Sequence, residues 1–102
     1  MILHCVFCSF RDDISEDASK AAINALEDFS LKLDGVIAFD HGPNLDFEMK
    51  SQAYDRGFVI RFTDAQALDN YANHPTHKEL GGQLSQLCVG GGDGIIVFDL
   101  DV

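Results

Sequence analysis

The sequence has few basic residues, and this shortage disfavours two classes of partner. Lysine and arginine together number 7, against 17 aspartates and glutamates, which gives the chain a formal charge of −10. Such a balance repels phosphate backbones and anionic lipid. We therefore expect neither nucleic acid nor a membrane surface as the main partner.

Long apolar runs and an export signal are also missing. No apolar stretch approaches the ~20 residues that span a bilayer. The start, Met1 to His4, is not a basic region followed by an apolar segment and a cleavage site, so we expect no signal peptide. The three cysteines are an odd number, and without export they are expected to be reduced thiols. These observations predict a cytoplasmic protein.

Apolar residues, by contrast, make up 46% of the chain. This content and a length of 102 residues suit one hydrophobic core that needs no disulfides. We expect residues 1–102 to form a single domain.

Hydrophobic periodicity predicts four strands and two helical regions. Ser15 is the expected N-cap of the first helix, Gly35 its C-terminal glycine, and Thr63 to Gln66 has the form of a capping box. Gly90 to Gly94 is expected to be a flexible loop. The predicted elements are strands at residues 2–10, 36–40, 54–62 and 95–100, a helix at 16–33, a short helix ending between residues 71 and 73, and another beginning at or just after residue 75.

This order of elements predicts an α+β fold of the ferredoxin-like kind, a four-stranded antiparallel sheet with helices on one face. Three of the four strands carry apolar residues on both faces, and the helices can cover one face alone. Each large side chain left in water would forfeit about 1.5–3 kcal/mol. We therefore predict a homodimer in which two sheets face each other.

The segment from Tyr71 to His77 gathers the most reactive side chains. Pro75 should end one helix and begin another, which exposes side chains at the junction. His77 can act as a base or acid near neutral pH, and the Tyr71 phenol can donate a hydrogen bond to an oxyanion. The alternative is that Tyr71 is a core aromatic and both histidines of the segment lie at a solvated helix end.

Other polar side chains have simpler expected roles. His41 has no identifiable partner and is expected at a strand end in water. Asp40, Asp99 and Asp101 are expected to be solvated strand ends or edge charges that discourage further strand pairing.

Taken in order, several motifs resemble the stress-responsive A/B barrel domain family, called Dabb. The resemblance covers nearly the whole chain and implies a dimeric α+β barrel, in which ferredoxin-like subunits pair their sheets. It rests on the opening strand with His4, Gly42-Pro43-Asn44, Tyr54, the segment from Phe62 to Tyr71, His74-Pro75-Thr76-His77, and Val97-Phe98-Asp99.

Some plant members of this family are polyketide cyclases, which close a poly-β-keto chain by aldol condensation with a histidine base and a tyrosine that holds a carbonyl oxygen. The resemblance gives these roles to His77 and Tyr71 and places His4 in the pocket. A further pocket histidine corresponds to Arg56, which departs from the cyclase pattern. His74 completes the expected ligand-binding residues, and no cofactor or metal is expected.

Two functional hypotheses lead. In the first, a small aromatic or polyketide-like ligand binds between sheet and helices, where His77 abstracts a proton next to a carbonyl and Tyr71 stabilises the enolate. In the second, the protein is a non-catalytic, stress-induced dimer that acts by protein association. A cofactor-free oxygenase or isomerase is a third. A metal site of His4, His74 and His77 is a fourth, disfavoured by the proline that disturbs the helical register.

Overall fold

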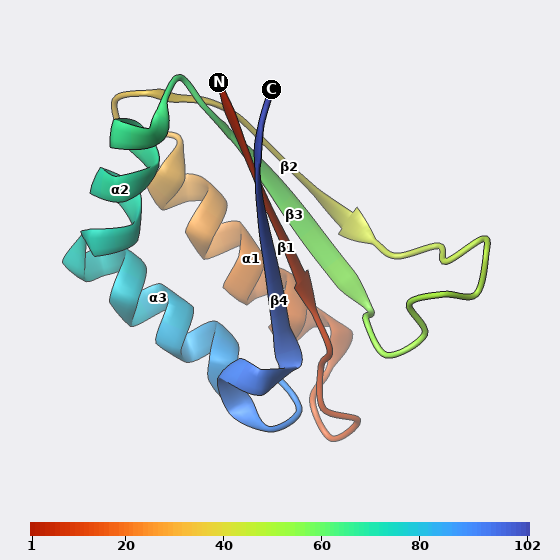
Figure 1. The fold of residues 1–102 in the computed structure, drawn as a ribbon. Coiled ribbons are helices and arrows are strands. Elements are labelled where there is room, and N and C mark those ends of the chain that lie inside the picture. The colour runs from red at the N-terminus through yellow and green to blue at the C-terminus, as the bar shows by residue number, and fades with distance from the viewer.

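The computed structural model describes the whole chain, from Met1 to Val102. Four strands form one antiparallel sheet in the order β2-β3-β1-β4, and the three α-helices lie on one of its faces (Figure 1). This is the predicted α+β, ferredoxin-like arrangement. The elements in chain order are β1 (Ile2–Cys8), α1 (Glu16–Ser30), β2 (Val36–Pro43), β3 (Arg56–Phe62), α2 (Ala65–Asn73), α3 (Pro75–Gln86), a short 3-10 helix η1 (Gly91–Gly94) and β4 (Ile95–Asp101).

Helix α1 begins as predicted and ends earlier than predicted. The Ser15 side chain accepts a hydrogen bond from the backbone N–H of Ala18 at 3.1 Å, so Ser15 is the N-cap. The helix stops at Ser30 because the chain then turns toward Gly35, whose φ is +85°. A side chain at Gly35 would place its Cβ 2.5 Å from the Cβ of Ala67, so this turn requires glycine.

The proline break lies where the sequence predicts it. Helix α2 ends at Asn73, His74 has extended backbone angles, and α3 begins at Pro75. The capping box was predicted at Thr63, but Asp64 is the N-cap of α2, because its carboxylate accepts from the N–H of Ala67 at 2.9 Å.

Other boundaries also differ from the sequence-based expectation. Strand β1 ends at Cys8, where the prediction ended at residue 10, and β3 begins at Arg56, where the prediction began at residue 54. Strand β2 continues to Pro43, where the prediction ended at Asp40, because pairing with β3 persists along that length. The glycine-rich segment is not simply a loop, since Gly91–Gly94 forms one 3-10 turn immediately before β4.

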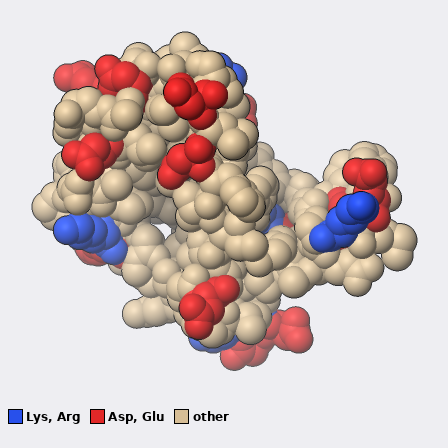
Figure 2. Space-filling model, viewed as in Figure 1, with Lys and Arg blue, Asp and Glu red and all other residues tan.

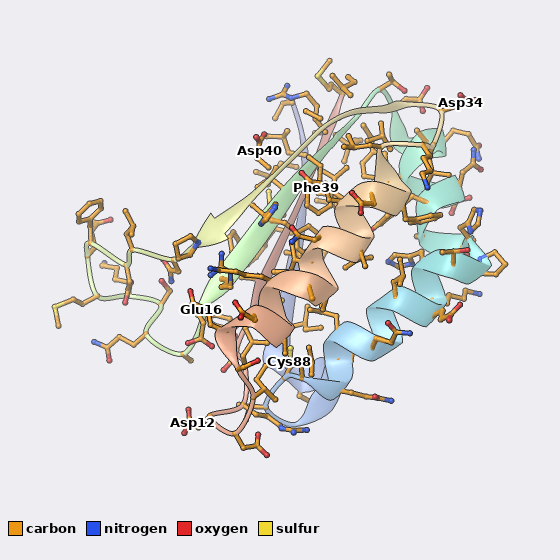
Figure 3. The ribbon with its side chains drawn as sticks, turned by 180° about the vertical axis from the view of Figure 1, so that it is seen from behind. Asp12, Glu16, Asp34, Phe39, Asp40 and Cys88 are labelled. Carbon is orange, nitrogen blue, oxygen red and sulfur yellow. The ribbon has the colours of Figure 1, made fainter.

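Alternation along the strands sends one set of side chains toward the helices and the other set away from them. Figure 3 shows this on β2, where Phe39 points toward α1 and Asp40 points away from the helices. The helix-facing set of β3 is buried throughout. The hydrophobic core consists of Val6, Cys8, Phe10, Ile23, Leu26, Phe39, Phe58, Ile60, Phe62, Ala67, Tyr71, Leu84 and Cys88.

No helix covers the opposite face of the sheet, which we call the open face (Figure 1). It includes Phe7 from β1 and Phe98 and Leu100 from β4, and all three are exposed; Phe98 keeps 54% of its surface. The predicted apolar surface on the second side of the sheet is therefore present. None of the helices has the length and apolarity that a bilayer span requires.

Candidate functional site

The helical layer does not reach the edge strand β4. Val97 and Asp99 face the helix side, because they pair with the helix-facing residues Val6 and His4 of β1. Yet Val97 is 47% exposed and the Asp99 side chain 45%. Figure 2 shows a small opening through the molecule, to the left of the position of β4 in Figure 1. The helix side of β4 is therefore partly uncovered, and we call this strip of the surface, next to the ends of the helices, the β4 groove.

Tyr71 and His77 lie together beside this groove. Their ring centroids are 4.3 Å apart, with the ring planes tilted by 47°. The Tyr71 ring is also 5.6 Å from that of His4 and 5.3 Å from that of Phe62. Tyr71 is only 1% exposed, so its ring belongs to the core. Contacts between aromatic rings at these separations favour particular orientations, so the neighbouring rings orient that of Tyr71.

The proline break determines which nitrogen of His77 is free. In an unbroken helix the Ala72 carbonyl would accept from the N–H of Thr76, but this N–H donates to His74 Nδ1 at 3.1 Å. The Ala72 carbonyl instead lies 3.0 Å from His77 Nδ1. Because a carbonyl can only accept, Nδ1 carries the proton, and Nε2 of a neutral His77 keeps its lone pair. The break thus orients His77 as a base.

The protonation states suit that role. Burial lowers the pKa of His77, the hydrogen bond to the Ala72 backbone opposes this shift, and electrostatic interactions with His4, His74 and Lys78 add to the lowering. The imidazole is therefore neutral and able to accept a proton at pH 7. Burial raises the pKa of Tyr71, with the nearby Ser30 hydroxyl acting in the opposite direction, so the phenol stays protonated.

A carboxylate that was not predicted to take part holds His4. We expected Asp99 to be a solvated edge charge, but its Oδ1 lies 2.6 Å from His4 Nδ1. The carboxylate accepts, so Nδ1 of His4 carries a proton and its orientation is fixed. The two residues face each other directly across β1 and β4. Their partnership could be found from the sequence only once this strand register was known.

The other predicted residues lie farther out. His74 caps α3 through Nδ1, and its ring packs on Phe29 at 4.8 Å between centroids. Arg56 is not near the groove, because it pairs with Cys8 at one end of β1 whereas His4 pairs with Ile60 farther along the strand. The structure thus brings together three of the five predicted site residues, places His74 at their margin and separates Arg56 from them.

Arg56 and His41 have other partners. Arg56 is buried, its Nη1 lies 3.3 Å from Glu16 at the start of α1, and its Nε has no hydrogen-bond partner. His41 was expected in water without a partner, but its Nε2 lies 3.5 Å from a carboxylate oxygen of Glu27 in α1. Both contacts join the sheet to α1.

The larger hollows of the surface lie elsewhere. One, of about 730 Å³, is on the open face, and the second, of about 310 Å³, lies next to Arg56 and Ser15. Neither is lined by His4, Tyr71 or His77. No group of three or more histidine, cysteine, aspartate and glutamate side chains is placed to share a metal ion.

Comparisons with known proteins agree with this fold. The chain is 44% identical to a dimeric ferredoxin-like protein of unknown function from Jannaschia sp. CCS1, with a TM-score of 0.92 over 99% of this chain and 98% of that one. Hydroxynitrile lyase from Passiflora edulis shares the fold at 14% identity, with a TM-score of 0.83 over 99% of this chain and 92% of that one.

A relative in Arabidopsis thaliana, stress-response A/B barrel domain-containing protein HS1, is 24% identical over 98 residues, which are 96% of this chain and 86% of that protein. A family model described as the stress responsive A/B barrel domain matches residues 2–102. The chain therefore belongs to the stress responsive A/B barrel domain family, Dabb.

Proposed function

We propose that this protein is a homodimer that binds a small carbonyl compound, aromatic or polyketide-like, in the β4 groove and catalyses proton transfer on it. The observation that carries the proposal is the pair of Tyr71 and His77, with ring centroids 4.3 Å apart and the His77 Nδ1 proton directed to a backbone carbonyl. That arrangement leaves a neutral imidazole nitrogen beside a neutral phenol, which suits proton abstraction next to a carbonyl.

The proposed step needs no cofactor. His77 Nε2 takes the proton from the carbon next to the carbonyl. The electron pair of that C–H bond forms a carbon–carbon double bond, and the π pair of the carbonyl moves to its oxygen, which gives an enolate. The Tyr71 hydroxyl donates a hydrogen bond to that oxygen. The neighbouring Ser30 hydroxyl donates to the Leu26 carbonyl at 2.6 Å, so the Tyr71 proton is available to the substrate oxygen. His4, held by Asp99, forms the groove wall.

Exchange of substrate protons for deuterium tests this step without knowledge of the full reaction. Neutral aromatic methyl ketones would be incubated with the protein in D2O, and loss of the methyl signal followed by NMR. We expect exchange above the buffer rate with the wild type and none above it with His77→Ala. His41→Ala is the matched control, since His41 lies outside the groove and should leave the rate unchanged. Equal rates for wild type and His77→Ala would remove His77 from the proposal.

The dimer is the second part of the proposal. The exposed Phe7, Phe98 and Leu100 of the open face support it, since burying such side chains is favourable by about 1.5–3 kcal/mol each. The related protein from Jannaschia is described as dimeric. We place the action of the dimer in the cytosol, where free thiols such as those of Cys5, Cys8 and Cys88 persist.

A non-catalytic dimer is the second candidate function. It is favoured by the 1% exposure of Tyr71 and by the distance of the two larger hollows from this residue. In this case the His4 and His77 ring signals would not move when the ketones are added in an NMR titration. Shifts confined to these two histidines would favour the groove as a ligand site.

A further inference from the structure

The segment between β2 and β3, residues 44–55, projects from the sheet as an arm (Figure 1). It carries three large apolar side chains that are mostly exposed to solvent. Phe47 is 89% exposed, and Leu45 and Met49 are each 71% exposed. Single exposed apolar residues are ordinary, but a group on one projecting segment marks a contact surface.

Polar contacts inside the arm hold it in this shape. Asp46 Oδ1 accepts hydrogen bonds from the backbone N–H groups of Lys50 and Ser51 at 3.0 Å each and from the Ser51 hydroxyl at 2.8 Å. The Asn44 amide donates to the Tyr54 carbonyl at 2.9 Å. Because the arm is ordered before it meets a partner, little conformational entropy is lost on contact.

The backbone around the exposed Phe47 is strained. Asp46 and Met49 have positive φ angles of 47° and 57°, which non-glycine residues rarely adopt. The hydrogen bonds from Ser51 to the Asp46 carboxylate, which lower the pKa of that group, offset part of this strain. The loop is therefore built to keep Phe47 and Met49 directed away from its own sheet.

The hollow of about 730 Å³ lies between the base of this arm and the open face. From the sheet it is lined by Phe7, Val59 and Phe98, all on the open face. Leu45 lines it at the base of the arm, whereas Phe47 and Met49 do not, so these two side chains are free to contact another molecule.

A projection and a hollow on one surface of the same chain are self-complementary. A two-fold axis between two copies puts the projection of each into the hollow of the other, and both contacts form together. The open-face strand residues include few charges, Asp40 and Arg61, so two copies of this acidic chain can approach there without strong repulsion.

We propose that the arm of each subunit seats on the open face of a second copy, with Phe47 entering the hollow beside the partner's Phe98. This inference rests on the proposed dimer and is independent of the proposed proton transfer. It assigns the arm as the clamp that sets the strength and register of the dimer.

The dimer dissociation constants of two variants, measured on dilution, distinguish failure of the proposed clamp from failure of the proposed dimer. We expect Phe47→Ser to raise the dimer dissociation constant at least about tenfold, as removal of a central aromatic contact does, in sedimentation velocity. Leu31→Ser is the matched control, since Leu31 is also apolar and exposed but follows α1, away from the open face. If Phe47→Ser dissociates like the wild type while Phe98→Asp splits the dimer, the clamp is wrong and the dimer stands. A monomeric wild type overturns both.

Photocrosslinking locates the contact directly. Phe47 would be replaced by p-benzoylphenylalanine, and 14N- and 15N-labelled subunits mixed before irradiation, so that mass spectrometry distinguishes links between chains from links within one. We expect links between chains to peptides of β1 or β4. Links only within one chain, links to other surfaces of the partner, or no links overturn the proposal. A different protein as the natural occupant would appear as a wild-type monomer whose arm stays unlinked.

Discussion

The two faces of this one sheet differ in what covers them. On the helix side, Ile60, Phe62 and Tyr71 are buried by the protein's own helices. On the open side, Phe98 and Leu100 remain in solvent. Strands that are apolar on both faces therefore encode two separate surfaces, one completed within the chain and the other, in our proposal, by a second copy.

On the helix side, we expect substitution of Tyr71 to cause the largest loss of stability. Tyr71→Ala removes a buried ring from a close-packed cluster, and we expect the free energy of unfolding to fall by about 3–5 kcal/mol. Urea denaturation measures this loss. Tyr71→Phe keeps the ring and should cost about 1 kcal/mol. A similar loss for both variants would mean that the hydroxyl, and not the ring, holds this part of the core.

On the open side, we expect a single introduced charge to disrupt the proposed dimer. Phe98→Asp would bury an unpaired carboxylate in the proposed interface, which costs several kcal/mol, so we expect dimer affinity to fall by about 100-fold or more. Sedimentation equilibrium measures the affinity. Far-UV circular dichroism should stay unchanged, because Phe98 is exposed within one subunit. An unaffected dimer would show that the subunits meet through another surface.

Protonation of His77 should weaken the helix side at acid pH. Its pKa is lowered by burial from the ordinary value of 6.5, so the unfolded state binds more protons at and below that pH. We therefore expect the free energy of unfolding to fall as the pH drops through about 6.5 and to level off once the folded state is protonated as well. The variant His77→Gln keeps the other three histidines. The difference in the free energy of unfolding between wild type and this variant, followed across pH, therefore isolates the effect of His77. A difference that does not vary between pH 8 and 5 would contradict the lowered pKa.

The smallest effect is expected at the groove wall. The carboxylate of Asp99 is half exposed, so Asp99→Asn should lower stability by less than about 1 kcal/mol. The hydrogen-bonded Nδ1 proton of His4 should give a downfield NMR signal in the wild type that is lost in the variant. Asp101→Asn, on the same strand, is the control. Retention of the signal in Asp99→Asn would assign the His4 proton to another acceptor.

Local patterns predicted most of the fold because each of them is set by neighbouring residues. Alternation in β3 separated Phe58, Ile60 and Phe62 from Val59 and Arg61, and Pro75 fixed the helix break. The errors lie at the ends of helices and strands, where tertiary contacts determine the last residue of the element. Strand β2 outlasts its prediction because β3 pairs with it to Pro43, and α1 stops early to make the turn at Gly35.

The site was predictable where it is local or implied by the family resemblance. Tyr71 and His77 flank the proline, and the structure brings them into contact. The pairing of His4 with Asp99 depends on the register between the first and last strands, which no local pattern specifies. Arg56 was placed in the site by analogy with a cyclase histidine, but the pairing of β3 with β1 puts it at the other end.

The mass of the wild-type protein at micromolar concentration tests the comparison of the two faces most directly. Sedimentation equilibrium should give twice the mass of one chain, since the open face is uncovered within a single subunit. A mass of one chain at that concentration would contradict the account, because its exposed phenylalanines and leucine would then have no cover.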